Sequence, residues 1–349
     1  MPKPFFTLMS YLVGALVLCV ACTADREISS IPHLEAEELE GLDLVSTQPF
    51  YSLRWPQFLL VAEPRGLLWG YGGDVLRLDL AEGKVHSLSL VDPARGFDRL
   101  VSADRRPDGT LALLDASGRV LVWNTDGGDV HRFTATPEPS WGGLALSGDH
   151  VYLMSQGEDD GSPAVRAFAF DGTPAGNWGD RSPSALIQAS LNGGGITSCP
   201  DGTVYYSYIN SPQILRLGAD GRVEEVGEAR SDFRTLTASS IRGTAEDGRR
   251  LKSVTPLVQL GLGTSRVMSL HCSAEGLLFR HIADPAPPGS LIEVWDSLSG
   301  ELLGAVHPRA GVLLDVDDQV LYLGSVDQEV PFRLERLHYA PEDWKRSHG

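Results

Sequence analysis

The chain has 349 residues, a formal net charge of −17 and a pI of about 4.9. An acidic body disfavours nucleic acid and anionic lipid surfaces as partners, because neutralisation of phosphates by basic residues drives such binding. No basic stripe with interleaved aromatic residues occurs in the sequence. The composition therefore excludes a nucleic-acid-binding role.

Residues 1–21 have the form of a signal peptide. Lys3 precedes the apolar stretch Tyr11–Ala21, which is too short for a comfortable membrane span. The segment Leu18-Cys19-Val20-Ala21-Cys22 resembles a bacterial lipoprotein signal, in which small residues precede a cysteine that is lipidated and becomes the new N-terminus. Cys19 stands where that motif prefers Leu, so an ordinary cleaved signal and an uncleaved anchor remain alternatives. We expect lipidation of Cys22, export, and anchoring to the bacterial cell envelope at the outer membrane or periplasmic face.

Residues 22–41 are interpreted as an acidic tether. The segment contains Glu35, Glu37, Glu38 and Glu40. A solvated linker is the favoured interpretation, and one short helix around residues 34–39 is the alternative.

One sequence unit occurs six times between about residues 58 and 340. Each copy has two apolar runs joined by a tight turn, such as Pro107-Asp108-Gly109 or Pro200-Asp201-Gly202. Pro presets φ and Gly accepts positive φ, so these are turns between strands. The six hairpins span residues 58–69, 100–114, 143–154, 195–206, 267–279 and 312–323.

A third apolar run follows every hairpin, and most copies continue through an Asp-Gly or Ser-Gly turn into a polar fourth strand such as Arg222–Val226. Four strands in about 40 to 50 residues match the blade period of β-propellers. We therefore predict an all-β fold over residues 42–349, a six-bladed β-propeller of four-stranded antiparallel blades. A β-sandwich with coincidental turns is the alternative.

Two features of the spacing need separate interpretation. Residues 229–262 lack a complete hairpin and are interpreted as a long connection between the fourth and fifth blades. The sixth copy ends near His338-Tyr339 without a fourth strand. We expect an early segment, either Glu27–Ile31 or Leu42–Val45, to supply that strand and close the ring.

Cys199 and Cys272 each stand at the end of a first strand, in consecutive blades. Export favours their oxidation. Packed sheets, however, lie about 10 Å apart, whereas a disulfide needs Cα atoms within about 7 Å. A disulfide between them is thus a hypothesis that the sequence leaves open. No His or Cys at ligand spacing accompanies them, so the sequence predicts neither a zinc site nor any cofactor.

Catalytic motifs are mostly absent: the sequence has no Gly-x-Ser-x-Gly elbow, no His-Glu-x-x-His and no Walker loop. His271 is interpreted as a structural residue, while His281 and His307 are expected in loops. Propeller lactonases, as a family, hold calcium with Glu, Asn and Asp residues at the channel mouth. The positions expected there contain only one acid and cannot build such a site: Trp55, Asp98-Arg99, Trp141, Asn192, Ser265-Arg266 and Arg309.

The loops that ring the channel mouth are rich in arginine and aromatic residues despite the acidic composition. Arginine binds carboxylate and phosphate groups in a bidentate way, and aromatic rings add stacking surface. We therefore predict a site for an anionic small molecule or peptide on that face. The alternative is that these arginines pair with nearby acids such as Asp92 and Asp98. The candidate ligand-binding residues are Arg99, Trp141, Arg266, Arg309, Arg280 and Tyr208.

By its repeats and its signal segment the chain resembles the bacterial six-bladed propeller lipoproteins of the NHL/TolB-like group. The resemblance implies an envelope-anchored binding or scaffold protein, with the membrane as a partner through the lipid anchor and a protein or anionic small molecule as a second partner. Two alternatives stay open. One is a propeller enzyme, either a lactonase-like hydrolase or a sugar dehydrogenase, although the residues favour a non-enzymatic role. The other is an accessory subunit of an envelope uptake complex.

Overall fold

The computed structural model describes residues 42–43, 45–46, 56–62, 65–70, 75–79, 84–88, 100–106, 108–124, 130–135, 140–157, 161–191, 193–218, 220–227, 232–285, 289–308, 311–317, 319–325 and 333–340. Contacts divide the chain into two compact units, Met1–Ile31 and Pro32–Gly349, and every described residue belongs to the second unit. The predicted signal peptide, the tether and Cys22 therefore lie outside the described residues.

The described strands of this unit form six sheets, and five of these have four antiparallel strands. The first two of these are β7–β10 (Leu100–Arg105, Thr110–Asp115, Arg119–Asn124, Val130–Thr134) and β11–β14 (Ser140–Ser147, His150–Gln156, Pro163–Ala169, Pro174–Asp180). The next two are β15–β18 (Gly195–Ser198, Val204–Ser207, Ile214–Leu217, Val223–Val226) and β19–β22 (Arg266–Cys272, Leu277–Ala283, Ser290–Asp296, Leu302–Val306). The fifth combines β23–β25 (Val312–Asp317, Val320–Ser325, Arg333–His338) with β1 (Leu42–Asp43).

The remaining sheet has five strands in the order β2-β6-β5-β4-β3. Its strands are β2 (Val45–Ser46), β3 (Pro56–Ala62), β4 (Arg65–Gly70), β5 (Val75–Asp79) and β6 (Lys84–Leu88). The prediction of six four-stranded blades is therefore wrong: five sheets have four strands, and the remaining sheet has five. The extra strand β2 directly follows β1 in the chain and pairs in parallel with β6.

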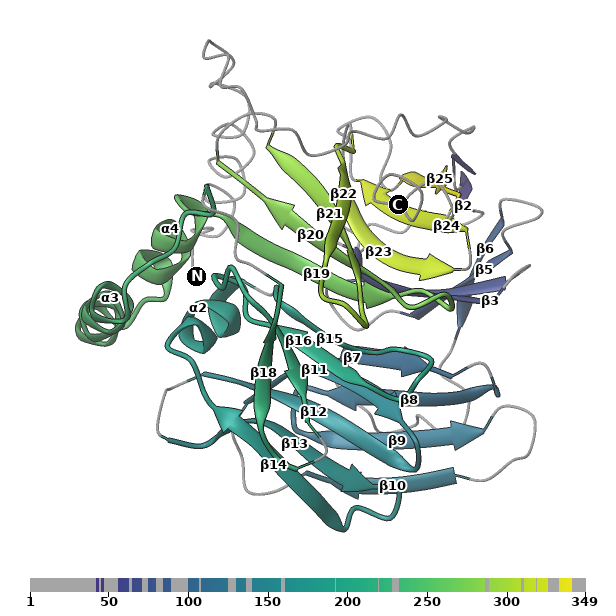
Figure 1. Cartoon of the computed structure of the whole chain (residues 1–349), viewed down its shortest axis with the longest axis horizontal. Helices are drawn as coiled ribbons and strands as arrows, with labels where there is room; N and C mark the ends of the chain where they lie inside the picture. The colour runs from purple at the N-terminus through teal and green to yellow at the C-terminus, as the bar shows by residue number, and fades with distance from the viewer. Residues whose placement is uncertain are drawn as a thin grey trace, which may run out of the picture. The chain divides into compact units, whose positions relative to one another are not determined.

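The first strand of each sheet contacts the first strands of the two neighbouring sheets, in the order β3, β7, β11, β15, β19, β23 and back to β3. We call these six the inner strands. The apolar cores lie between neighbouring sheets: one, for example, combines Val120 of β9 with Leu144 and Leu153 of the next sheet. Antiparallel sheets that close into such a ring define a β-propeller (Figure 1).

The N-terminal strands close this ring at its outer edge. Leu42 of β1 pairs with Leu334 of β25, and Val45 of β2 pairs with Lys84 of β6. Within the predicted segment Leu42–Val45, residues 42 and 43 supply the last strand of the final sheet as expected, whereas Val45 pairs with the first sheet. The other candidate, Glu27–Ile31, lies outside the described residues.

Side chains of one inner strand satisfy backbone groups on the open edge of the next inner strand. Leu144 N–H donates to Ser102 Oγ at 3.0 Å, and Leu146 N–H donates to Asp104 Oδ2 at 2.7 Å. Ser198 Oγ donates to the Leu146 carbonyl from the other side at 2.6 Å. Because 102 and 104 match 144 and 146 in order, β7 and β11 run in the same direction. Between β7, β11 and β15, these side-chain hydrogen bonds satisfy backbone groups that have no partner strand on that side.

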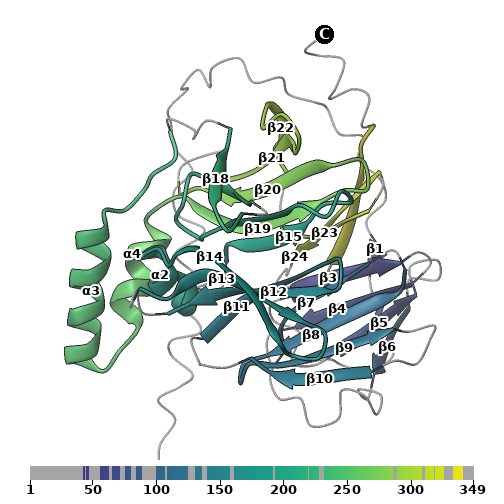
Figure 2. The same ribbon diagram turned by 60° about the horizontal axis from the view of Figure 1, so that its bottom comes forward.

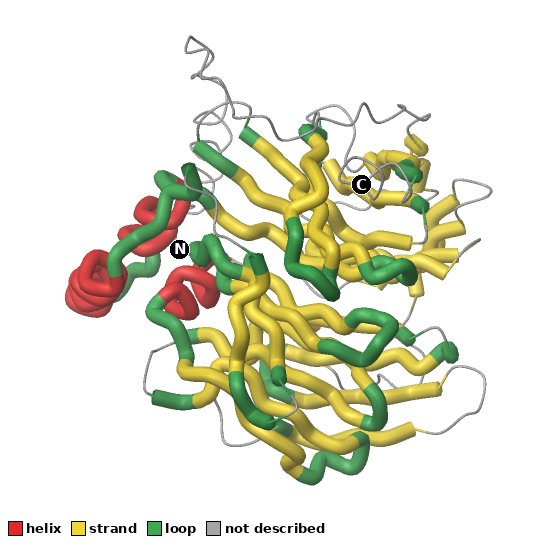
Figure 3. The backbone as a smooth tube through the Cα atoms, viewed as in Figure 1, coloured by secondary structure: helices red, strands yellow, loops and turns green. Residues whose placement is uncertain are grey.

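Within the described residues, the strands are interrupted by the helices α2 (Ser184–Leu191), α3 (Ala238–Leu251) and α4 (Thr255–Leu262). They lie together on one side of the sheets, as Figure 3 shows in red. The sheets agree with the predicted all-β propeller, and α3 and α4 lie in the predicted long connection between the fourth and fifth blades, whose helical structure the sequence analysis did not predict. The helices share an apolar cluster that includes Ile187 of α2, Ile241 and Ala245 of α3 and Leu257 of α4.

Local sequence explains where the helices begin. Thr237 caps α3, because its Oγ1 accepts a hydrogen bond from the backbone N–H of Ser240 at 3.2 Å. Ile241, Ala245 and Gly248 recur at helical spacing and form the buried face. Pro256 lies in the first turn of α4, where its missing N–H removes no hydrogen bond.

Candidate functional site

The end of the ring at which the inner strands begin is the mouth face, and the predicted site lies there. Trp141 opens β11 and Arg266 opens β19. Tyr208 follows β16, whose last residue Ser207 pairs with Gly195 at the start of β15. The Val267 N–H donates to the Ile209 carbonyl at 2.7 Å and ties two of these sheets together. Backbone topology thus brings three of the predicted residues to one end of three consecutive sheets.

The side chains of Trp141 and Tyr208 are buried, and each packs in a different apolar core. Trp141 is 3% exposed, with Phe168 at a centroid distance of 6.3 Å and the Arg166 guanidinium 6.0 Å from its ring. Tyr208 is 2% exposed and packs edge-on against Tyr206 at 5.9 Å. Both aromatic residues belong to apolar cores between sheets, so the prediction that they form an open stacking surface is wrong.

Arg280 does not lie in a mouth loop. It lies in the middle of β20, its side chain is fully buried, and its guanidinium is paired with Glu293 of β21 at 2.5 Å. Its Nη1 donates to the carbonyl of Pro212, which lies between β16 and β17 of the neighbouring sheet, and Trp295 Nε1 donates to the same Glu293 carboxylate at 3.1 Å. The assignment of Arg280 to ligand binding is therefore corrected: its position and contacts make it a structural link between two sheets.

Arg266 is the predicted residue whose position fits a binding role best. Its side chain is partly buried, and its Nε has no hydrogen-bond partner among the described residues. Burial lowers the pKa of the guanidinium, and the negative charge of Asp284 opposes this shift. A cation that has lost part of its hydration at the mouth of the ring favours an acceptor from outside.

Arg99 and Arg309 lie outside the described residues. That these two arginines join Arg266 on the mouth face therefore stays a prediction.

Sequence reasoning missed the helix that lies beside these residues. Gln188 of α2 accepts a hydrogen bond from the Ile209 N–H through Oε1 at 3.3 Å, and its Nε2 approaches Met154 Sδ at 3.8 Å. A Cβ at Gly142 would come within 2.8 Å of the amide groups of Gln156 and Gln188, so a larger residue there would displace one of these side-chain ends. Helix α2 therefore packs tightly against the start of β11. The apolar period of residues 184–191 was the sequence signal for it.

The segment that carries α3 and α4 is fixed to the mouth face through Asn210. The Asn210 Nδ2 donates to the carbonyl of Ser265 at 2.8 Å and to Thr264 Oγ1 at 3.1 Å. Its Oδ1 accepts from the Leu236 N–H at 2.9 Å. Asn210 is 3% exposed, so these bonds form away from solvent. They hold the helical segment at both of its ends.

A serine–histidine pair occurs in the sheet β19–β22. His281 lies in β20, not in a loop as expected, and its Nε2 is 2.7 Å from Ser290 Oγ. The Leu313 N–H donates to Nδ1 at 3.2 Å, so Nδ1 carries no proton and the neutral ring donates from Nε2 to the serine. Burial lowers the pKa of His281 to about 3, and neighbouring His271 adds to the lowering. Because Nε2 is occupied by its proton, His281 cannot accept one from Ser290 as a catalytic base.

His271 lies in β19 beside this pair. Its Nδ1 is 3.9 Å from Asp315 Oδ1, and its buried Nε2 has no hydrogen-bond partner among the described residues. A purely structural histidine would be expected to have partners for both ring nitrogens. Burial lowers its pKa to about 4. Within the described part of the chain, no group of three or more His, Cys, Asp or Glu side chains is arranged to hold a metal ion.

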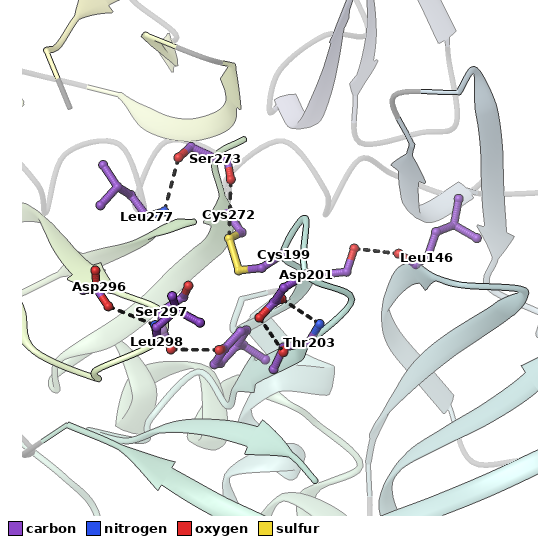
Figure 4. The surroundings of a disulfide bond; sticks show 12 residues. Leu146, Cys199, Asp201, Thr203, Cys272, Ser273, Leu277, Asp296, Ser297 and Leu298 are labelled. Atoms are coloured by element: carbon purple, nitrogen blue, oxygen red, sulfur yellow. Dashed lines mark hydrogen bonds between the residues drawn. A yellow bond between two sulfur atoms is a disulfide. The ribbon is translucent and has the colours of Figure 1, made fainter. Parts of the chain in front are cut away.

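Cys199 and Cys272 form a disulfide with Cα atoms 5.3 Å apart (Figure 4). The bond joins the ends of β15 and β19, at the opposite end of these strands from the mouth face. The spacing of face-packed sheets does not apply here, because the sheets converge at their inner strands. Direct backbone hydrogen bonds such as Gly194 N–H to the Val267 carbonyl, at 2.7 Å, show how closely these sheets approach.

Comparisons with known proteins agree on the fold. No protein-family model and no curated sequence matches the chain. A solved structure of a DUF4221 family member from Bacteroides vulgatus superposes with a TM-score of 0.58 at 10% identity, covering 88% of this chain and 98% of that one. Regucalcin from Agrobacterium tumefaciens, described as a calcium-binding protein, superposes with a TM-score of 0.52 at 11% identity, covering 88% and 96%.

These neighbours are β-propellers, and at such identities the likeness shows the fold alone. The chain is therefore a β-propeller protein with antiparallel four-stranded blades. Membership of the NHL/TolB-like group stays a prediction. None of the helices in the described residues has the length and hydropathy that a bilayer crossing requires.

Proposed function

We propose that this chain is an exported, lipid-anchored binding propeller that takes an anionic ligand at its mouth face. The observation that carries the binding role is Arg266, a partly buried cation at the start of β19 whose Nε has no partner among the described residues. An incoming carboxylate or phosphate would supply the acceptor that the guanidinium needs and would offset the cost of its burial.

Export and anchoring are supported by two observations of different kinds. The sequence before Cys22 resembles a lipoprotein signal. The disulfide between Cys199 and Cys272 is the bond expected of a protein that folds in an oxidising compartment. Both are properties of a periplasmic or surface lipoprotein, and a group of that kind, such as the NHL/TolB-like propellers, is the proposed family.

Ligand binding is tested on a soluble form that begins at Thr23, by thermal shift against sugar acids, peptide carboxylates and phosphates. We expect at least one anionic compound to raise the melting temperature, and Arg266→Gln to abolish the shift. Arg222→Gln is the matched control, because that arginine is 83% exposed in an outer hairpin. If no anionic compound shifts the melting temperature, or if Arg266→Gln responds like the unmodified chain, Arg266 is not a ligand-binding residue.

Anchoring is tested separately with the full chain. We expect Cys22→Ser to prevent lipidation and to release the protein from the membrane fraction. If the variant still partitions with membranes after a high-salt wash, the anchor is something other than acyl chains at Cys22.

A further inference from the structure

Helices α3 and α4 form a hairpin whose turn has a fixed shape. Lys252 ends α3 with φ of 51° and ψ of 43°, a left-handed conformation, and its N–H donates to the Arg249 carbonyl. The Ser253 N–H donates to the Gly248 carbonyl at 2.9 Å. These two hydrogen bonds cap the C-terminus of α3, because they satisfy carbonyl groups of its last turn. We call residues 249–254 the hairpin tip.

Two apolar side chains of the tip face solvent. Leu251 is 68% exposed and Val254 is 63% exposed. The apolar residues that hold the hairpin to α2 are a different set, which includes Ile241, Ala245 and Leu257, and all three are buried. Packing of the helices therefore accounts for the inner face of the hairpin and not for Leu251 and Val254. In Figure 2, α3 is the helix farthest from the sheets.

The charge of this segment is opposite to that of the rest of the chain. Residues 232–262 contain five basic and three acidic residues, whereas the whole chain has a net charge of −17. Arg249, Arg250 and Lys252 alternate with the exposed apolar residues of the tip, and all three are exposed. The ion pair between Arg250 and Asp247 is 3.7 Å long and open to solvent, so it neutralises the tip only weakly.

We propose that the hairpin tip docks on the surface of a bilayer that contains anionic phospholipid. Leu251 and Val254 enter the boundary between headgroups and acyl chains, while the neighbouring cations contact lipid phosphates. The acidic remainder of the chain is repelled by the same surface, which agrees with the sequence-based exclusion of anionic lipid for the body as a whole. Docking is therefore local to the tip, and it is a membrane contact independent of the proposed anchor at Cys22.

The test uses the soluble form that begins at Thr23, which retains all of the second compact unit (Pro32–Gly349) and lacks Cys22. Binding is measured by co-sedimentation with vesicles of phosphatidylcholine alone or with about one third phosphatidylglycerol. We expect binding to the anionic vesicles, weakened by salt, and little binding to the neutral ones. Leu251→Ser combined with Val254→Ser should weaken it at least tenfold, and Arg250→Glu combined with Lys252→Glu should do the same.

Leu298→Ser is the matched control, because Leu298 is also an exposed leucine (76%) but lies in the turn between β21 and β22. This variant should bind like the unmodified chain. Equal melting temperatures of all variants verify that folding is retained. The proposal is overturned if the unmodified chain does not bind anionic vesicles, if it binds neutral vesicles equally well, or if the Leu251/Val254 variant binds as tightly as the Leu298 control. The absence of Cys22 from this form keeps the result separate from the test of the anchor.

Discussion

The guanidinium of Arg280 and the carboxylate of Glu293 form an ion pair in which neither side chain is exposed to solvent. The two residues face each other directly across β20 and β21. The Arg280 Nε donates to Glu293 Oε2 at 2.8 Å, and Trp295 and the Pro212 carbonyl take part in the same network. The pair therefore joins two strands within one sheet and reaches the sheet beside it.

Arg280→Met should destabilise the protein by about 3–5 kcal/mol, because it leaves the Glu293 carboxylate buried without its partner. Arg216→Met is the control, since the Arg216–Glu224 pair is exposed and such pairs contribute about 0–1 kcal/mol. Urea unfolding measures both effects. Similar losses in the two variants would contradict the structural role of the buried pair.

Replacing Cys199 and Cys272 together by Ala should lower the free energy of unfolding by about 4 kcal/mol. This is the contribution expected from the loop-closure entropy of a disulfide that links residues 73 positions apart. The loss should show as a lower melting temperature. Reducing agent should lower the melting temperature of the unmodified chain to the same value. If the reduced and oxidised chains unfold at one temperature, the bond does not restrain the unfolded state as described.

Acid should destabilise the fold through the buried histidines. In the folded state the pKa of His271 is about 4, below the ordinary value of 6.5. Between these two pH values the unfolded chain therefore binds more protons than the folded chain. Stability is thus fully present above about pH 6.5 and falls as the pH drops towards about 4. His271→Leu should flatten this slope in urea unfolding, and His338→Leu, at an exposed position, is the control for losing one histidine. An unchanged slope in His271→Leu would contradict the assignment.

Asp104 should act in the opposite sense. Burial raises its pKa from 3.8 to about 6, while the N–H groups of Leu146 and Arg105 oppose the shift. The folded state therefore holds a proton that the unfolded state has released, and stability from this group falls as the pH rises from about 4 to about 6. Asp104→Asn should be more stable, relative to the unmodified chain, at pH 7 than at pH 4. Urea midpoints at the two pH values provide the measurement, and a difference that does not change with pH would refute it.

The strands could be predicted because their signals are local. A turn such as Pro200-Asp201-Gly202 specifies its own geometry, and Gly202 has a φ of 85° in the structure. Helix α3 was missed because Gly243 and Gly248 lower helix propensity. Gly248 is nevertheless required, since a Cβ there would come within 2.8 Å of the Ser253 carbonyl oxygen.

The burial of Arg280 and the disulfide depend on contacts that are distant in sequence. The apolar pattern predicts that the second strand of the hairpin 267–279 ends at Phe279 and that Arg280 lies in a loop, whereas β20 continues to Ala283. The acid that neutralises Arg280 lies on the next strand, and only the strand register identifies it. The disulfide likewise depends on the convergence of two inner strands, which no local pattern encodes.

The pairing of Leu42 with Leu334 has a consequence for biosynthesis. Strand β1 leaves the ribosome about 290 residues before its partner β25, so it stays unpaired until the last blade has been translated. Contacts of such long range slow folding. A chain interrupted at any point before β25 would retain an open sheet edge at both ends, and that edge marks it for aggregation or for removal by proteases. The ring can therefore close only after β25 has been synthesised, so a closed propeller requires a chain that extends at least to this strand.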